Sequence, residues 1–340
     1  MQAPLVTIGI PVYNRLRFLP QAVQSVEAQD YQNIELIVSD NGVNGGSIPE
    51  IVGKYYKRPY RFRQNLSTIN STLHWNQLVE AATGDYFIML GDDDEISPNF
   101  VSDLVGAAQQ YPEITVVIPR QEQMDEEGRT LRTSSEMVPE LLSGEEFIEA
   151  WCRGTYGWLT FSTILMKTSE IRRCGGYVVI PTGNADEDAL LIKMALNHSI
   201  GVSPRSIIRK RQHPTSLGYC CTYPELTEGA RAFIRFLDTD DILCDYAKHN
   251  VKRWRMLRGL IVEMLWKMCY GRWNDMYRSR LSLLKWAAVS LSMPWIPAYY
   301  SSVGRTLWDE SKFTVITSIK RRFPWIEKLS RSLRKARVER

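Results

Sequence analysis

Three consecutive carboxylates, Asp92, Asp93 and Asp94, follow directly after an apolar run at residues 86–90. The run has the length and composition of a buried strand. Because a core cannot hold that much charge, we expect the acids at the strand end, in water or on a cation. Carboxylates are preferred ligands of Mg²⁺ and Mn²⁺, which are often shared with substrate phosphates. This pattern indicates a metal-assisted site for a phosphorylated substrate, and the alternative is an acidic turn that caps a helix opened by Pro98.

Polar residues also follow the first two apolar runs of the chain. Pro11, Tyr13, Asn14 and Arg15 come after the first run, and Asp40 ends the second. Tyr13 could stack on a nucleotide base, and Asp40 could accept a hydrogen bond from a base or ribose. Since the carboxyl ends of parallel strands meet at one sheet edge, we expect these residues to gather near the acids.

A second acidic group lies later in the chain. Asp186, Glu187 and Asp188 open a helical pattern, where acids also suit the helix dipole. One of them could instead act as a general base that takes a proton from an attacking hydroxyl. His213 is a candidate metal ligand, although a lone histidine is more often structural or solvent-exposed. The neighbouring cations at residues 209–211 could neutralise a diphosphate.

Alternating strands and helices must position these groups. The pattern predicts a mostly parallel, doubly wound α/β sheet over the first 120 residues or so, followed by more mixed structure and a helical region from about residue 225. Strands are predicted at residues 6–10, 34–38, 60–63, 86–90, 114–118, 161–166 and 207–213, and helices at 18–26, 49–56, 72–82, 100–110, 189–197 and from a capping box at Ser143.

Composition limits the classes of protein that fit. The 340 residues are enough for one large or two smaller domains, and 44% hydrophobic residues fit a globular protein with a sizeable core. The six cysteines show no CxxC or metal-finger spacing, which favours reduced thiols in a cytosolic protein. The first residues lack the succession typical of a signal peptide.

The end of the chain is strongly basic. Residues 320–340 carry nine Lys and Arg against two Glu, interleaved with aromatic and aliphatic side chains. Such an amphipathic tail suits an anionic membrane surface better than a nucleic-acid duplex, and the alternative is a solvated basic end. Residues 281–300 are apolar, but Lys285, Pro294 and Pro297 make them a poor membrane span.

Taken together, the motifs resemble family 2 glycosyltransferases with the GT-A fold. The resemblance covers residues 4–218 and rests on motifs in the expected order at residues 8–15, 35–41, 82–86, 90–94 and 186–188, with 211–217 following the last. The form Leu90-Gly91-Asp92-Asp93-Asp94 is similar to that of bacterial enzymes that build O-antigen, capsule and related surface polysaccharides.

This resemblance implies a Rossmann-like, mostly parallel central sheet flanked by helices, with a helical C-terminal extension. It implies a nucleotide-sugar-binding and catalytic domain at residues 1–222 and a helical region at 223–340. The family pattern assigns Asp94 and His213 to Mn²⁺ or Mg²⁺. It assigns nucleotide-sugar binding to Pro11, Tyr13, Asn14, Arg15, Asp40, Asn65, Asp92 and Asp93, with Asp92 near the ribose.

The catalytic base of the family would lie among Asp186, Glu187 and Asp188, and here the sequence departs from the usual pattern. Matching Lys193 to the family's arginine puts Glu187 in the base position, whereas matching the literal Glu-Asp pair puts Asp188 there. We favour Asp188, because the shorter acid is usual. Asn65-Leu66-Ser67 likewise stands where Asn-x-Gly is common.

The implied activity is inverting transfer of a sugar from a nucleoside diphosphate to a saccharide acceptor, expected to be lipid-linked, in bacterial surface polysaccharide synthesis. The implied location is the inner face of the cytoplasmic membrane, with no nucleic-acid partner. A metal-dependent sugar nucleotidyltransferase is an alternative, although the loop at residues 12–15 lacks the glycines it would need. A non-catalytic sugar-binding protein is another, but it would need no second acid cluster.

Overall fold

The computed structural model describes residues 3–42, 44–111, 113–135, 140–157, 159–181, 185–213 and 223–277. The chain divides into two compact units, Met1–Val262 and Glu263–Arg340. The predicted domain boundary after residue 222 stays a prediction, and the helices that follow it begin within the first unit.

A ten-stranded sheet runs through the described part of the first unit, in the order β3-β2-β1-β4-β9-β6-β10-β5, with β7 on β6 and β8 on β10. The strands are β1 (Val6–Val12), β2 (Ile34–Asp40), β3 (Tyr60–Gln64), β4 (Tyr86–Met89), β5 (Glu95–Ile96), β6 (Ile114–Met124), β7 (Thr130–Thr133), β8 (Leu141–Ser143), β9 (Leu165–Lys167) and β10 (Ser199–Arg211). The helices are α1 (Leu19–Glu27), α2 (Ser47–Tyr55), α3 (Ser71–Ala81), α4 (Phe100–Gln110), α5 (Gly144–Cys152), α6 (Thr168–Arg173), α7 (Asp186–Ala195), α9 (Tyr223–Thr239), α10 (Asp241–His249) and α11 (Val251–Tyr277).

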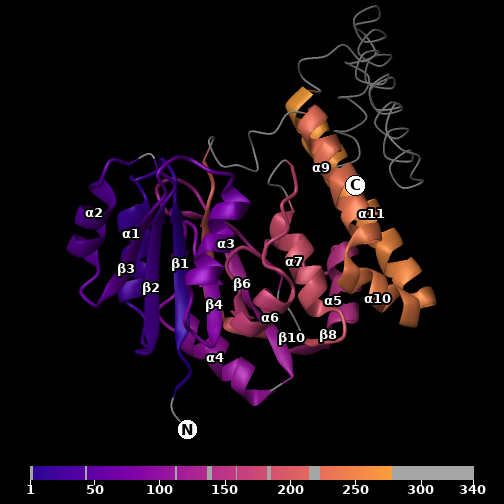
Figure 1. The fold of residues 1–340 in the computed structure, drawn as a ribbon, viewed down its shortest axis with the longest axis horizontal. Coiled ribbons are helices and arrows are strands. Elements are labelled where there is room, and N and C mark those ends of the chain that lie inside the picture. The colour runs from indigo at the N-terminus through magenta and orange to yellow at the C-terminus, as the bar shows by residue number, and fades with distance from the viewer. Residues whose placement is uncertain are drawn as a thin grey trace, which may run out of the picture. The chain divides into compact units, whose positions relative to one another are not determined.

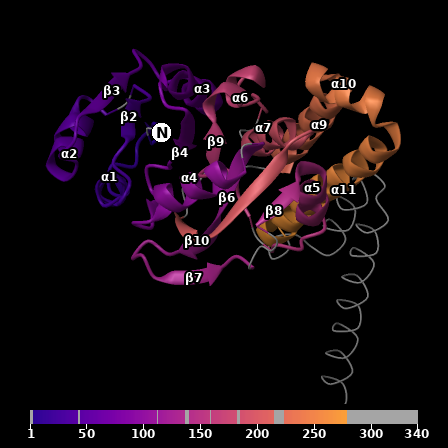
Figure 2. The same ribbon diagram turned by 90° about the horizontal axis from the view of Figure 1, so that it is seen from below.

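The strands that carry the candidate site are largely parallel, as the alternating pattern predicts. β1 pairs in parallel with β2 and β4, β2 with β3, and β6 with β10. The difference from the prediction is β9, which lies between β4 and β6 and runs antiparallel to both. Figure 2 shows the long β10 alongside β6. The carboxyl ends of β1, β2 and β4 therefore meet at one edge of the sheet.

Helices cover both faces of the sheet. Successive side chains of β1 point to opposite faces and nearly all are buried, so both faces need a covering layer. Val6, Ile8 and Ile10 are fully buried in a cluster that includes residues of α1, α2 and α4. On the opposite face, a Cβ added at Gly9 would lie 3.1 Å from the ring of Phe87 of β4, so the glycine leaves room for that side chain. Figure 1 shows α3, α4 and the strands between them.

Several predicted elements differ in extent. The strand predicted at 161–166 is confirmed only as the short β9, and the one predicted at 207–213 begins earlier, at Ser199. The early part of β10 alternates over only five residues before Pro204, and pairing with β6 and β8 satisfies its backbone. The capping box at Ser143 is confirmed at the start of α5.

The described residues 223–277 are helical, as predicted. No helix among the described residues is long and apolar enough to cross a membrane. The tail at residues 320–340 and the apolar stretch at 281–300 lie outside the described residues, as do the segments 214–222 and 278–280.

Candidate functional site

The three acids after β4 form a tight, buried loop. Asp92, Asp93 and Asp94 are only 1%, 9% and 6% exposed, so of the two expected surroundings, water or a cation, water is excluded and the cation stays a prediction. Their charge is tolerated because each carboxylate faces a cationic or donor group of the protein itself. Gly91 makes this loop possible, since a Cβ there would lie 2.9 Å from Oδ2 of Asp94.

Arg15, from the loop after β1, links two of the acids. Its Nη2 lies 3.0 Å from Oδ1 of Asp92, and its Nη1 lies 3.1 Å from Oδ2 of Asp93. This contact joins the ends of β1 and β4, as the sequence predicted for groups at one sheet edge. A planar guanidinium that bonds two carboxylates fixes their relative orientation as well as their charge.

Lys210 supplies the cation at the third acid. Its Nζ lies 3.3 Å from Oδ2 of Asp94 and donates a hydrogen bond to the hydroxyl of Ser162. The backbone N–H of Arg211 donates to the other oxygen of Asp94, at 3.0 Å. Asp94 is thus held from β10 by one residue's side chain and the next residue's backbone.

His213 closes the cluster just beyond the end of β10. Its Nε2 lies 2.7 Å from Oδ2 of Asp93 and 3.3 Å from Nη1 of Arg15, and its ring stacks on Phe18 with the centroids 5.7 Å apart. The sequence placed His213 with Asp94 as a metal ligand. In the structure its ring contacts the carboxylate of Asp93, the neighbouring acid of the same loop.

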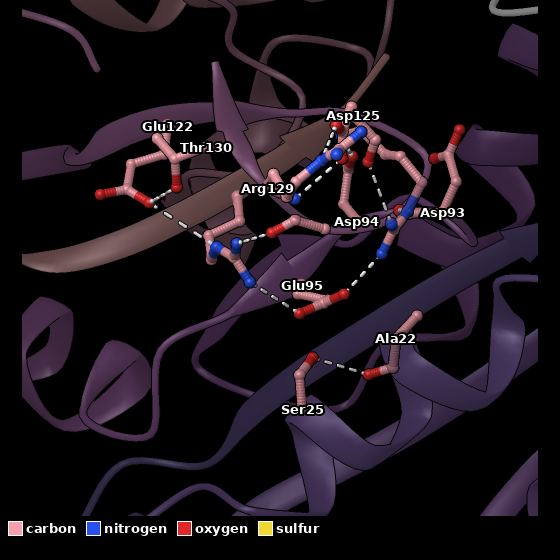
Figure 3. Close-up of polar contacts among 12 residues, drawn as sticks. Ala22, Ser25, Asp93, Asp94, Glu95, Glu122, Asp125, Arg129 and Thr130 are labelled. Atoms are coloured by element: carbon pink, nitrogen blue, oxygen red, sulfur yellow. Dashed lines mark hydrogen bonds and ion pairs between the residues drawn. The ribbon is translucent and has the colours of Figure 1, made fainter. Parts of the chain in front are cut away.

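The two arginines that flank Lys210 point elsewhere. Glu95, drawn in Figure 3 with Asp93 and Asp94, accepts hydrogen bonds from Nη2 of Arg211 at 2.5 Å and from Nη1 of Arg209 at 3.1 Å. Arg211 also donates to the carbonyl of Asp93 at 3.0 Å. Lys210 contacts a carboxylate of the acid triplet, whereas the Arg211 side chain reaches only a backbone carbonyl of that loop, which fits the alternation of side chains along a strand. The arginines brace the loop from its other side.

A second polar group forms at the end of β2. Asp40 is fully buried and accepts hydrogen bonds from Nδ2 of Asn44 at 2.8 Å and from Nε2 of Gln64 at 3.3 Å. The same Asn44 amide donates to the carbonyl of Tyr13, whose side chain is 45% exposed. Asp40 is therefore linked through Asn44 to the backbone of the loop after β1, where the ring of Tyr13 stays accessible to solvent.

Asn41, which sequence reasoning missed, organises the loop after β3. Its Oδ1 accepts hydrogen bonds from Nδ2 of Asn65 at 3.0 Å and from the backbone N–H of Ile69 at 3.1 Å. Its own amide donates to the carbonyl of Ile69 at 2.9 Å. The signal was its place directly after a buried strand, next to Asp40. Of the other predicted residues, Pro11 lies within β1 and Asn14 is exposed beside Arg15.

The acids at the start of α7 have three different environments. Asp186 is fully buried and accepts hydrogen bonds from the Thr72 hydroxyl and, at 3.0 Å, from the N–H of Ile180. The charges of Lys210 and Asp94 both act on Glu187. Asp188 instead exerts its charge on Cys152 of α5. Glu187 is therefore in electrostatic contact with the acid loop.

The pKa values follow from this burial. Burial raises the pKa of Asp92 to about 7 although Arg15 opposes the shift, and burial likewise raises the pKa of Glu187 to about 7 against the pull of Lys210. For Asp93, burial is outweighed by the hydrogen bond with His213 and the charge of Arg15, so its pKa is lowered. The cluster thus holds acids that are easily protonated beside one that stays ionised.

This donor set suits a hard divalent cation. The carboxylates of Asp92, Asp93, Asp94 and Glu187 outnumber the facing cations, Arg15 and Lys210, and Oδ2 of Asp92 is buried with no hydrogen-bond partner. A bound cation would satisfy that oxygen and offset the excess negative charge. Within the described residues, no three His, Cys, Asp or Glu side chains are already arranged as a metal site.

Comparison with known proteins identifies the family. Residues 7–168 match the family model described as Glycosyl transferase family 2. This segment, just under half of the chain, is similar to the family's glycosyltransferase domain. Among family relatives, an uncharacterized glycosyltransferase of Rickettsia felis is 32% identical over 131 residues, which is 38% of this chain and 21% of that protein. Putative glycosyltransferase EpsE of Bacillus subtilis is 28% identical over 181 residues, or 51% of this chain and 60% of that protein. The chain therefore spans less than two-thirds of either relative.

Solved structures confirm the GT-A fold expected for the family. Residues 1–349 of TarS from Staphylococcus aureus superpose with a TM-score of 0.55 at 17% identity, covering 83% of this chain and 77% of that one. The mannosyltransferase PcManGT from Pyrobaculum calidifontis gives a TM-score of 0.52 at 14% identity, covering 95% and 88%. At these identities the likeness concerns the fold.

Proposed function

We propose that the protein transfers a sugar from a nucleoside diphosphate to an acceptor hydroxyl. The observation that carries this proposal is the buried Asp92–Asp94 loop. The ammonium of Lys210 pairs with Asp94 of this loop and also interacts electrostatically with Glu187. A cation-ready carboxylate loop and a carboxylate with a pKa near 7 are the two groups that glycosyl transfer requires. TarS in complex with UDP-GlcNAc, and PcManGT in complex with GDP-Man and Mn²⁺, support a donor of this class.

The nucleotide would bind along the ends of β1 and β2. The exposed ring of Tyr13 suits stacking on the base, and Asp40 and Asn65 shape the loops that would border it. Asp93 and Asp92 orient the guanidinium of Arg15 through the ion pairs described above, and Arg15 would place its positive charge at the diphosphate end of the donor. These roles follow the family pattern and are part of the proposal.

Asp94 and the oxygen of Asp92 that has no hydrogen-bond partner would hold Mn²⁺ or Mg²⁺. His213 contacts Asp93, the acid between them in the chain. When bound, such a cation offsets the negative charge that develops on the departing diphosphate. Around it, Arg15 and Lys210 supply fixed positive charge, and the loop of acids keeps the donor's phosphates at one position on the sheet edge.

Glu187 is proposed as the catalytic base in place of Asp188. The acceptor oxygen would attack the anomeric carbon, the bond from that carbon to the diphosphate oxygen would break, and Glu187 would take the hydroxyl proton. One displacement from the opposite face inverts the anomeric configuration. The choice rests on electrostatic contact, because Glu187 feels Lys210 and Asp94 whereas Asp188 acts on Cys152.

The acceptor is proposed to be a lipid-linked saccharide used in surface polysaccharide synthesis, reached from the inner face of the cytoplasmic membrane. This part rests on the motif resemblance and on the basic, amphipathic residues 320–340. Binding to vesicles that contain anionic lipid should fall when this tail is deleted. Unchanged binding would remove the tail as the membrane contact.

The test of the activity begins with a thermal-shift screen of nucleotide-sugars with Mn²⁺, because a ligand of the native state raises the melting temperature. The stabilising donor is then incubated with and without saccharide acceptors, and the release of nucleoside diphosphate is measured. Acceptor-dependent release that is lost in Asp94→Asn supports the proposal. Pyrophosphate exchange would indicate a nucleotidyltransferase instead, and binding without any turnover would indicate a sugar-binding protein.

A further inference from the structure

Lys210 is a buried ammonium in a place where the proposed function needs a metal ion. Its side chain is 15% exposed, and its Nζ lies 3.3 Å from Oδ2 of Asp94. Its charge also acts on Asp93 and on Glu187. It therefore offsets negative charge of both the acid loop and the proposed base. Because side chains alternate along β10, Lys210 lies on the opposite face of the strand from Arg209 and Arg211.

A divalent cation on this oxygen of Asp94 would meet the positive charge of Lys210. A divalent cation of this kind binds a carboxylate oxygen at about 2.0–2.1 Å. With the ammonium already within 3.3 Å of the same atom, the two positive charges would face each other across a buried site. Either the ammonium moves or the cation binds weakly.

The ammonium has other partners to which it can turn. Nζ already donates to the hydroxyl of Ser162, and the carboxylate of Glu187 lies within its electrostatic reach. Leaving Asp94 would therefore not leave a buried charge without compensation, which is the condition for an exchange at low cost.

We propose that Lys210 is an internal counter-cation that competes with the divalent metal for Asp94 and turns to Ser162 and Glu187 when the metal binds. The proposal rests on the proposed function for the identity of the metal site. In the metal-free protein the ammonium keeps the acid loop folded. On metal binding, the Lys210 side chain moves its positive charge toward Glu187. Metal binding at the donor site thereby changes the electrostatic environment of the proposed base.

The experiment measures Mn²⁺ binding to the full chain without donor, by electron paramagnetic resonance of free Mn²⁺ and by calorimetry. Lys210→Met removes the ammonium, and Lys210→Arg keeps a positive charge. The matched control is Arg205→Met, which makes the same change in net charge at an 80% exposed side chain paired with Asp103. We expect Lys210→Met to bind Mn²⁺ at least about tenfold more tightly than wild type, with Lys210→Arg and Arg205→Met close to wild type.

A folding control keeps the result interpretable, since removing one partner of a buried ion pair can destabilise the protein. The melting temperature of each variant is measured with and without Mn²⁺. Mn²⁺ should raise that of Lys210→Met more than that of wild type. Equal or weaker Mn²⁺ binding by Lys210→Met, together with no larger thermal shift, would overturn the competition.

Failure of this inference can be told apart from failure of the proposed function. Release of nucleoside diphosphate by the wild-type protein is measured separately, in Mn²⁺ and in chelator. Acceptor-dependent release with no gain of Mn²⁺ affinity in Lys210→Met overturns only the competition. A gain of affinity in a protein that releases no diphosphate supports the competition and overturns the transferase.

Discussion

Nε2 of His213 lies 2.7 Å from Oδ2 of Asp93, although the two residues are 120 positions apart in the chain. The contact joins the end of β10 to the loop after β4, and Arg15 from the loop after β1 bonds the same carboxylate oxygen at 3.1 Å. Three strand ends are thus connected through one acid. Asp93 is accordingly the acid of the triplet whose pKa is lowered, through the hydrogen bond with His213 and the charge of Arg15, which outweigh its burial.

The first prediction concerns this contact. His213→Ala should reduce kcat/KM about 10–100-fold, because Asp93 then loses a partner that orients it. Asp93→Asn should have a similar effect, and the double variant should be little worse than either single one, since both changes break the same contact. Steady-state kinetics on the four proteins measures the coupling. Fully additive losses would mean that the two residues act independently.

The second prediction separates the two candidate bases. Glu187→Gln should lower kcat by about 10²–10⁴-fold while the donor's dissociation constant stays within a few-fold of wild type. Asp188→Asn, which changes the neighbouring acid whose charge acts on Cys152 of α5, serves as the matched control and should retain most activity. Rates are measured as diphosphate release with saturating acceptor. The reverse ranking of the two variants would restore Asp188 as the base.

The third prediction is the pH dependence. Burial raises the pKa of Glu187 to about 7, and a base must be ionised to accept a proton. Activity should therefore fall as pH drops below about 7, by roughly tenfold per unit once the acid is mostly protonated, and level off above it. The pH profile of kcat/KM tests this. If the residual rate of Glu187→Gln keeps the same acid limb, another group, such as Asp92, carries it.

The fourth prediction gives Asp186 a structural role. Asp186→Ala should lower the free energy of unfolding by about 1–3 kcal/mol, because the Thr72 hydroxyl and the Ile180 N–H lose their buried acceptor. Thr72→Val, which removes one of these donors, should cost less. Chemical denaturation measures both. A stable Asp186→Ala protein that has lost as much activity as Glu187→Gln would instead place Asp186 in the chemistry.

Much of the fold was predictable because its signals are local. The apolar runs at β1, β2 and β4 and the capping box of α5 lie within a few neighbouring residues, so periodicity and capping rules find them. β9 and the first half of β10 were predicted poorly, since their strand character depends on the partners beside them. No local pattern states that β9 runs antiparallel between β4 and β6.

By itself, the sequence determined which groups could do chemistry. These are the acid triplet at residues 92–94 after a buried strand, the acids at residues 186–188 at a helix start, and His213 at the end of the last predicted strand. The tertiary structure decided how they are divided. Burial brought Lys210 to Asp94 and turned Arg209 and Arg211 away to Glu95. It also gave adjacent acids of α7 different surroundings, because a helix turns each successive side chain by about 100° toward a different neighbour. Spacing along the chain predicts the direction of each side chain on the helix, but only the tertiary structure shows which groups that side chain meets.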